Sequence, residues 1–178
     1  MNAKSGQSEA SPADSRRQST GDEGEIHADP LSPTTTQPKG CTPTASTFIW
    51  PIRVYWEDTD AGGVVYHASY LRFLERARSE WLRTLGYAQD ALREREGVVF
   101  VVRAMRLEFL RPARLDDELS VDVTLVERRR ASLLMRQIIR RGDKQLLDAE
   151  VKVACVTATD FRPRAVPDAL VAMLTEPE

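Results

Sequence analysis

Apolar and polar positions divide the chain into a polar first part and a patterned remainder that begins at Phe48. Residues 48–57 are rich in β-branched and aromatic side chains, with Pro51 near the start, and predict a strand. Residues 58–66 contain the pair Gly62 and Gly63 and predict a loop. Residues 68–85 then repeat apolar side chains at helical spacing, and Gly86 is placed to stop the helix.

The predicted helix has a wide apolar face. At 100° per residue its main apolar stripe consists of Tyr70, Leu74, Ala77, Trp81 and Leu85. Leu71, Leu82 and Phe73 widen this stripe to about half the circumference, more than a helix on a flat surface needs. We therefore expect a curved sheet to hold this helix. On its polar side, Arg76 and Glu80 have the spacing of an ion pair.

Four long strands are predicted after a shorter helical piece at residues 88–96. Apolar and polar side chains alternate along much of residues 98–111, 119–125, 133–140 and 147–155, and residues 168–174 predict a last short helix. Short connections such as the turn at Gly142 favour antiparallel neighbours, so we expect the four strands to form a meander. One amphipathic sheet face covering one helix gives an α+β fold with two layers.

Residues 1–47 have the composition of a disordered, low-complexity tail, which leaves residues 48–178 as one folded domain. The tail has no Phe, Trp or Tyr and carries half of the prolines. Such a segment buries too little apolar surface to offset the entropy of ordering it. It lacks the apolar region of a signal peptide, and its acids outnumber its bases, unlike a transit peptide. No apolar run approaches the ~20 residues of a membrane-spanning helix, so we expect a soluble protein.

Charge and cysteine content argue against a nucleic-acid-binding protein and against a small domain held by disulfides or a metal. Removing the four basic and six acidic residues of the tail from the totals of 25 and 27 leaves 21 of each. A domain of zero net charge has no electrostatic footprint for nucleic acid. Cys41 and Cys155 lie far apart in the sequence, so neither a disulfide framework nor a metal knuckle is expected, and a reducing compartment fits.

The candidate chemistry is concentrated between the first strand and the long helix. Asp58, Asp60 and His67 lie where a helix N-terminus directs backbone N–H groups, which suits attack on a polarised carbonyl. Asp60 could also cap the helix or fix the loop, since Asp is common in both roles. Asp58 is predicted to be structural, because two close carboxylates oppose each other's ionisation. The sequence offers no further ligand for a metal at these residues.

The stretch that carries these residues resembles a known family. It reads Arg53-Val54-Tyr55-Trp56-Glu57-Asp58-Thr59-Asp60-Ala61-Gly62-Gly63-Val64-Val65-Tyr66-His67-Ala68-Ser69-Tyr70-Leu71. This run resembles the 4-hydroxybenzoyl-CoA thioesterase-like family of hotdog-fold proteins, and within it the acyl-CoA thioesterases encoded alongside the bacterial Tol-Pal system. The likeness covers roughly residues 48–175 and includes the stretches 109–117 and 163–167.

The resemblance implies a hotdog fold, in which a curved antiparallel sheet wraps around one long central helix. It also implies homodimers formed through sheet edges, often paired into tetramers, with active sites at subunit interfaces. The implied activity is hydrolysis of acyl-CoA in lipid metabolism without a metal or other cofactor, in the cytoplasm or peripherally at the inner membrane. Acyl carrier protein is a second partner that fits the resemblance.

The same resemblance assigns roles to individual residues. Asp60 corresponds to the catalytic carboxylate, which acts as nucleophile or as general base on water. The helix N-terminus at His67 polarises the carbonyl. The implied substrate-binding residues are Tyr55, Gly62, Gly63, Val65, Tyr66, Glu75, Arg129, Arg130 and Ser132.

Plainer interpretations stand beside these roles. Glu75 could pair with Arg78 or Arg76, and the arginine run before Ser132 could be an ordinary solvated hairpin turn. The ring of His67 could pack at a subunit interface. The whole domain could be a non-catalytic module that binds acyl-CoA or acyl carrier protein, or a hotdog dehydratase.

Overall fold

The computed structural model describes residues 47–175, so the predicted tail lies outside the described residues except for Thr47. The elements are strand β1 (Phe48–Arg53), the 3₁₀ turn η1 (Trp56–Asp58), helix α1 (His67–Thr84), the short helices α2 (Gln89–Ala91) and η2 (Leu92–Glu96), strands β2 (Val98–Phe109), β3 (Glu118–Arg129), β4 (Ser132–Arg141) and β5 (Lys144–Thr157), and helix α3 (Asp168–Thr175). None of the helices in this part of the chain is long and apolar enough to cross a membrane.

The five strands form one antiparallel sheet in the order β1-β3-β4-β5-β2. The predicted meander is therefore correct for β3, β4 and β5 and wrong for β2, which pairs with β5 at the far edge. Residues 110–117 carry the chain away from β2, held by the N–H groups of Leu110 and Arg111 on the carbonyl of Leu146. They end beside β1, where Asp117 accepts a hydrogen bond from the N–H of Val54 at 3.0 Å.

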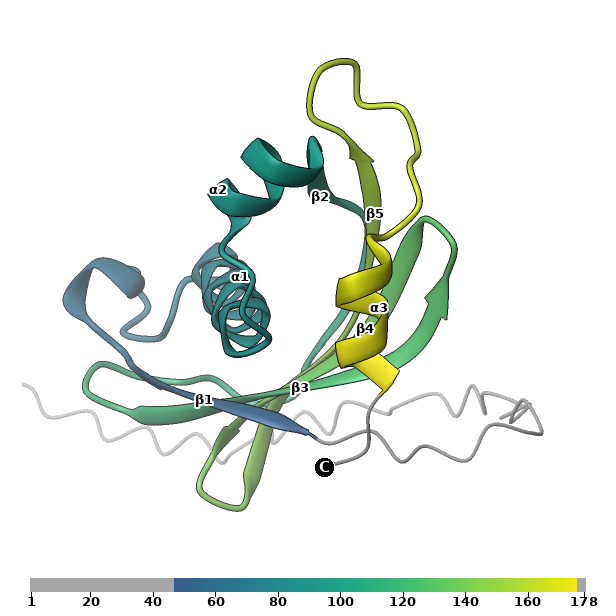
Figure 1. Cartoon of the computed structure of the whole chain (residues 1–178). Coiled ribbons are helices and arrows are strands. Elements are labelled where there is room, and N and C mark those ends of the chain that lie inside the picture. Colours follow the sequence, from purple (N-terminus) through teal and green to yellow (C-terminus); the bar gives the residue numbers. More distant parts are fainter. Residues whose placement is uncertain (1–46, 176–178) are drawn as a thin grey trace, which may run out of the picture. The chain divides into compact units, whose positions relative to one another are not determined.

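Helix α1 lies in the curve of the sheet, as the wide apolar face predicted (Figure 1). Phe73, Leu74 and Ala77 are fully buried, and they belong to one core with inward residues of the sheet such as Val121 and Val151. The predicted helix boundaries are within one residue of the observed ones. The expected Arg76–Glu80 ion pair is wrong, because Glu80 pairs with Arg83 instead.

The first strand is shorter than predicted, because the chain turns after Val54. The N–H of Asp58 donates to the carbonyl of Tyr55 at 3.0 Å and closes η1. The aromatic residues that favoured a longer strand, Tyr55 and Trp56, are exposed instead of paired. This early turn starts the loop that carries the candidate site.

Candidate functional site

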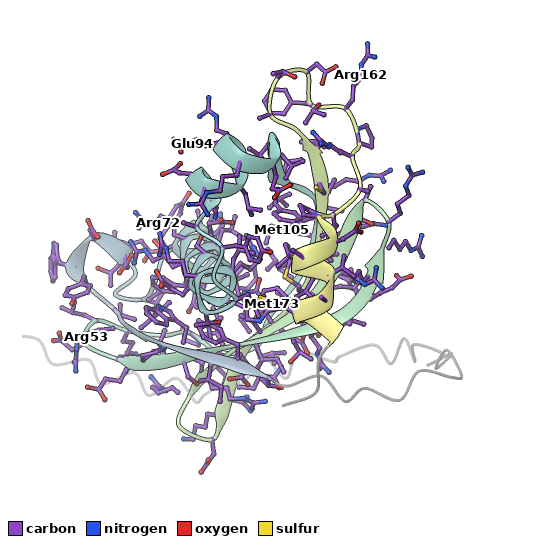
Figure 2. The ribbon with its side chains drawn as sticks, viewed as in Figure 1. Arg53, Arg72, Glu94, Met105, Arg162 and Met173 are labelled. Atoms are coloured by element: carbon purple, nitrogen blue, oxygen red, sulfur yellow. The ribbon has the colours of Figure 1, made fainter. Side chains whose placement is uncertain are left out.

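The loop between β1 and α1 is folded around the carboxylate of Asp58, which is completely buried. Its Oδ2 accepts a hydrogen bond from the N–H of Tyr55 at 3.0 Å, and its Oδ1 accepts one from Nη2 of Arg72 at 3.0 Å. Figure 2 shows Arg72 on α1, the helix that follows this loop. The carbonyl of Asp58 also accepts a hydrogen bond from the N–H of Tyr66 at 2.8 Å. The prediction that Asp58 is structural is confirmed by these contacts.

Asp60 lies two residues further along the loop and is exposed. Its Oδ1 accepts a hydrogen bond from the N–H of Gly62 at 2.8 Å, so the side chain helps to fix the turn. Its Oδ2 has no hydrogen-bond partner among residues 47–175. The backbone is held as well, because the N–H of Asp60 donates to the carbonyl of Val64 at 3.0 Å. One carboxylate oxygen is therefore used by the turn and the other is open to solvent.

Both glycines have a physical reason in this turn. A Cβ atom on Gly62 would lie 3.0 Å from Oδ1 of Asp60, closer than side chains normally approach. Gly63 has a φ of +71°, which favours glycine over residues with a Cβ. The pair therefore allows the backbone to wrap closely around the carboxylate of Asp60.

His67 is the first residue of α1, and its side chain is exposed. Its ring contacts that of Tyr66, with the centroids 4.4 Å apart and the planes at 57°. No side chain caps the helix, and its first turn contains no acidic residue. No capping side chain and no acidic residue of the first turn therefore offsets the positive end of the helix dipole, which suits stabilisation of a developing negative charge.

Two predicted binding residues hold the loop from either end. Tyr55 is 59% exposed, and its N–H is used by Asp58. Val65 is buried, and its N–H donates to the carbonyl of Ala113 at 2.8 Å. The N–H of Ala113 in turn donates to the hydroxyl of Tyr70 at 2.8 Å, and burial raises the pKa of that hydroxyl. The loop is therefore anchored both to α1 and to the segment before β3.

Glu75 lies two turns into α1, at an apolar cleft of about 60 Å³ that Trp81, Phe100 and Met135 help to line. Its carboxylate pairs with Arg78, which agrees with one of the two plainer interpretations made from the sequence. Arg78 is buried and donates from Nη1 to Oε1 of Gln137 at 2.6 Å.

Sequence reasoning missed Gln137, which is fully buried on β4 and donates to the carbonyl of Leu74 at 3.0 Å. A signal was present, because Gln137 occupies an inward position of an alternating strand. Its inward neighbours on that strand, Met135 and Ile139, are apolar and buried.

Arg129, Arg130 and Ser132 form the turn between β3 and β4. Arg129 and Ser132 are paired in register, and Arg129 donates to Glu127 at 2.7 Å, which lowers the pKa of the Glu127 carboxyl. Arg130 is exposed, and its carbonyl accepts the N–H of Val166 at 2.9 Å.

This turn is remote from the Asp60 loop within one chain. The start of β3 lies beside β1 and the loop, whereas the turn follows the other end of that 12-residue strand. At about 3.3 Å per residue the two ends are roughly 36 Å apart. A single chain therefore brings Asp60, Gly62, Gly63, Tyr66 and His67 together, but not the basic turn.

Comparisons with known proteins identify relatives of this chain. The model of the thioesterase-like superfamily matches residues 54–174. The Acyl-CoA thioester hydrolase YbgC of Escherichia coli O6:H1 is 52% identical over 126 residues, which are 70% of this chain and 93% of that protein. The Acyl-CoA thioesterase YbgC of Haemophilus influenzae is 48% identical over 120 residues, which are 67% of this chain and 88% of that protein.

A solved structure of similar fold is also a thioesterase by its name. The probable thioesterase from Bartonella henselae has a TM-score of 0.67 at 39% identity, and the match covers 68% of this chain and 100% of that one. The residues that the family model matches include helix α1, strands β2 to β5 and the loop that holds Asp60. The chain therefore belongs to the thioesterase-like superfamily and has the hotdog fold of these thioesterases.

Proposed function

We propose that the protein is an acyl-CoA thioester hydrolase that converts acyl-CoA and water into a free acid and CoA. Its relatives in Escherichia coli and Haemophilus influenzae carry the names of this activity. The observation that carries the proposal is the position of Asp60. One oxygen of its carboxylate is fixed by the turn and the other is open, and the turn leads directly into the uncapped N-terminus of α1.

In the proposed mechanism Asp60 acts on the carbonyl carbon of the thioester. It either attacks that carbon to form an acyl-enzyme anhydride, which water then hydrolyses, or it takes a proton from the attacking water. The carbonyl oxygen becomes an oxyanion in both routes, and the backbone N–H of His67 at the start of α1 is its proposed donor. Collapse of the tetrahedral intermediate expels the thiolate of CoA. In the first route water then cleaves the anhydride and frees the Asp60 carboxylate; in the second route Asp60 passes the proton it took from water to the departing thiolate or to solvent.

The side chain of His67 has a smaller role in this proposal. A thiolate leaves readily, since a simple thiol has a pKa of about 8.5, so no strong acid is needed to protonate it. The ring orients the thioester or the water molecule. In this proposal the backbone N–H of His67 stabilises the oxyanion, and its imidazole orients the thioester or the water.

We further propose that the site is completed by a second copy of the chain, with Arg129, Arg130 and Ser132 of one copy contacting the phosphates of CoA bound at Asp60 of the other. Guanidinium groups suit phosphate oxygens. β2 is an edge strand with exposed apolar residues such as Val102. If the β2 strands of two copies paired antiparallel, the start of β2 in one copy would lie beside the end of β2 in the other.

The position of α1 supports this pairing. The rings of Tyr70 and Phe109 are 5.7 Å apart, so the first turns of α1 lie beside the end of β2. The Asp60 loop is therefore close to the edge that would meet the partner. Dimers of this kind could pair again into tetramers through surfaces away from β2.

The remaining parts of the proposal concern where the enzyme acts. We place it in the cytoplasm or at the inner membrane surface, with a role in lipid metabolism alongside the Tol-Pal system. Acyl carrier protein is a second candidate thioester donor, because its phosphopantetheine arm presents the same reacting atoms as acyl-CoA. Copurification with acyl carrier protein, tested with and without an acyl group on its arm, would check this partner.

The test of the activity is a thiol-release assay across short, long, hydroxylated and aromatic acyl-CoAs. We expect turnover with at least one class, and we expect Asp60→Asn to lower it to a small residual rate while circular dichroism and Tm remain those of the wild type. Undiminished turnover by Asp60→Asn would contradict the mechanism. Stabilisation of the protein by acyl-CoA without release of thiol would identify a binding module instead.

A further inference from the structure

Asp58 connects more of the candidate site than any other side chain of the loop. It is the only acidic residue among residues 47–175 that is fully buried. Its two carboxylate oxygens accept from the N–H of Tyr55 and from Nη2 of Arg72, each at 3.0 Å. Its own carbonyl accepts from the N–H of Tyr66 at 2.8 Å. The contacts of this one residue therefore join the loop's first turn, its last residue and α1.

Arg72 transmits this connection to the first turns of the helix. Its Nη2 also donates to Oγ of Ser69 at 3.1 Å, and Ser69 is buried on the first turn of α1. The side chain of Arg72 is half exposed, whereas that of Asp58 has only 1% of its surface exposed. The buried carboxylate of Asp58 is thus the more rigidly held partner, and the guanidinium of Arg72 links it to helix α1.

The loop between these two anchors contains Asp60 and ends at His67. Thr59 and Val65 form an antiparallel β-bridge, so the segment between them closes into a loop that starts next to Asp58 in the sequence. The separation of the Asp60 carboxylate from the N–H groups of α1 is then set by how Asp58 holds both ends of the loop. We infer that Asp58, acting through Arg72, is a positioning residue that fixes the distance between Asp60 and the oxyanion donors.

This inference rests on the proposed function, because positioning matters only if Asp60 and the helix N-terminus act on the same carbonyl. A misplacement of about 1 Å in a catalytic geometry can lower the rate by about 10²-fold. An asparagine at position 58 cannot satisfy both contacts. It would present an NH₂ group either to the N–H of Tyr55 or to Arg72, both of which are donors.

The experiment measures kcat and KM of thiol release in Asp58→Asn and Arg72→Met, with Asp148→Asn as the matched control. Asp148 also forms an Asp–Arg ion pair, with Arg136 at 2.6 Å on two other strands. We expect kcat of Asp58→Asn to fall by about 10²-fold with little change in KM, and kcat of the control to stay that of the wild type. Arg72→Met tests the same link from an exposed side chain if Asp58→Asn fails to fold, and Arg72→Lys should recover part of the rate.

The Asp60→Asn background separates positioning from a purely structural role. If Asp58 acts by positioning Asp60, the change Asp58→Asn leaves the residual rate of Asp60→Asn unaltered. An equal loss in both backgrounds would overturn the inference, and so would wild-type kcat in folded Asp58→Asn and Arg72→Met. Wild-type turnover in Asp60→Asn alone would instead refute the proposed function, and the inference with it.

Discussion

The backbone N–H of Gly62 donates to Oδ1 of Asp60 at 2.8 Å, and a Cβ atom on that glycine would lie 3.0 Å from the same oxygen. The Asp60 carboxylate can therefore occupy this position only because Gly62 has no side chain. A methyl group there would have to displace the carboxylate by a few tenths of an ångström.

Replacement of this glycine is expected to damage activity more than stability. We predict that Gly62→Ala lowers kcat by about tenfold, less than the ~10²-fold loss associated with a 1 Å misplacement. The matched control is Gly63→Ala, where nothing lies within 4 Å of the added Cβ but φ is +71°. That control should cost about 1–2 kcal/mol in the free energy of unfolding. Steady-state kinetics and urea denaturation check both, and an unchanged kcat in Gly62→Ala would contradict the coupling.

The proposed oxyanion donor can be removed without removing the helix. His67 is the first residue of α1, where proline is well tolerated, and proline has no N–H. We predict that His67→Pro lowers kcat by about 10²–10³-fold, the usual cost of one lost donor. His67→Ala keeps the N–H and should retain most of the rate. Equal kcat values in the two variants would exclude the backbone donor.

The requirement for a second subunit can be tested at the free edge of the sheet. Val102 is 46% exposed on β2, so Val102→Lys should fold as a single chain. A charge placed in an apolar contact between two copies is costly to bury, and we predict that the variant becomes monomeric. Loss of thiol release should accompany this change. Size-exclusion chromatography with light scattering measures the assembly, and an unaltered oligomer would rule out pairing through β2 at this residue.

The buried contact between α1 and β4 should contribute to stability. Gln137→Leu leaves the guanidinium of Arg78 without its 2.6 Å acceptor, and a hydrogen bond to a charged group is worth about 1.5–3 kcal/mol. We predict a loss of that size in the free energy of unfolding, measured by chemical denaturation. Arg136→Met breaks an exposed ion pair with Asp148 and should cost less than about 1 kcal/mol. Similar losses in the two variants would show that burial of the Arg78 contact adds nothing.

The same exposed pair gives a prediction for acid stability. The hydrogen bond from Arg136 lowers the pKa of Asp148 below its ordinary value of 3.8. A carboxyl whose pKa is lower in the folded state stabilises the protein above the unfolded pKa, and this stabilisation disappears as pH falls through the folded pKa. Asp148→Asn should therefore flatten the stability curve below about pH 4 and differ from the wild type by less than ~1 kcal/mol at pH 7. Thermal unfolding from pH 2 to 7 measures the effect, and parallel curves would disprove it.

Local patterns predicted the helices and most strand boundaries, because apolar spacing along a continuous segment is sufficient to define them. The position of β2 was predicted wrongly, since its pairing with β5 depends on contacts far apart in the sequence. The Arg76–Glu80 prediction failed for a related reason. Glu80 lies at helical spacing from two arginines, Arg76 and Arg83, and spacing alone does not choose between them.

The candidate site likewise contains a part that is local in the sequence and a part that depends on distant segments. Asp60, Gly62, Gly63 and His67 all lie between positions 60 and 67, so the sequence alone was enough to bring them together. The contact between Arg78 and Gln137 spans 59 residues and required the register of β4 against α1. The distance between the Asp60 loop and the basic turn followed only from the strand order, because the sequence gives no measure of where two loops lie on a sheet.

The two borders of the sheet differ in a way that limits how copies of the chain can associate. β1 is a 6-residue border strand interrupted by Pro51, which cannot donate a hydrogen bond to a neighbour, whereas β2 has 12 residues and no proline. Once two chains join along β2, each end of the combined sheet presents only the proline-bearing border. Growth by strand addition would stop there, at a closed pair, and would not continue into a fibre.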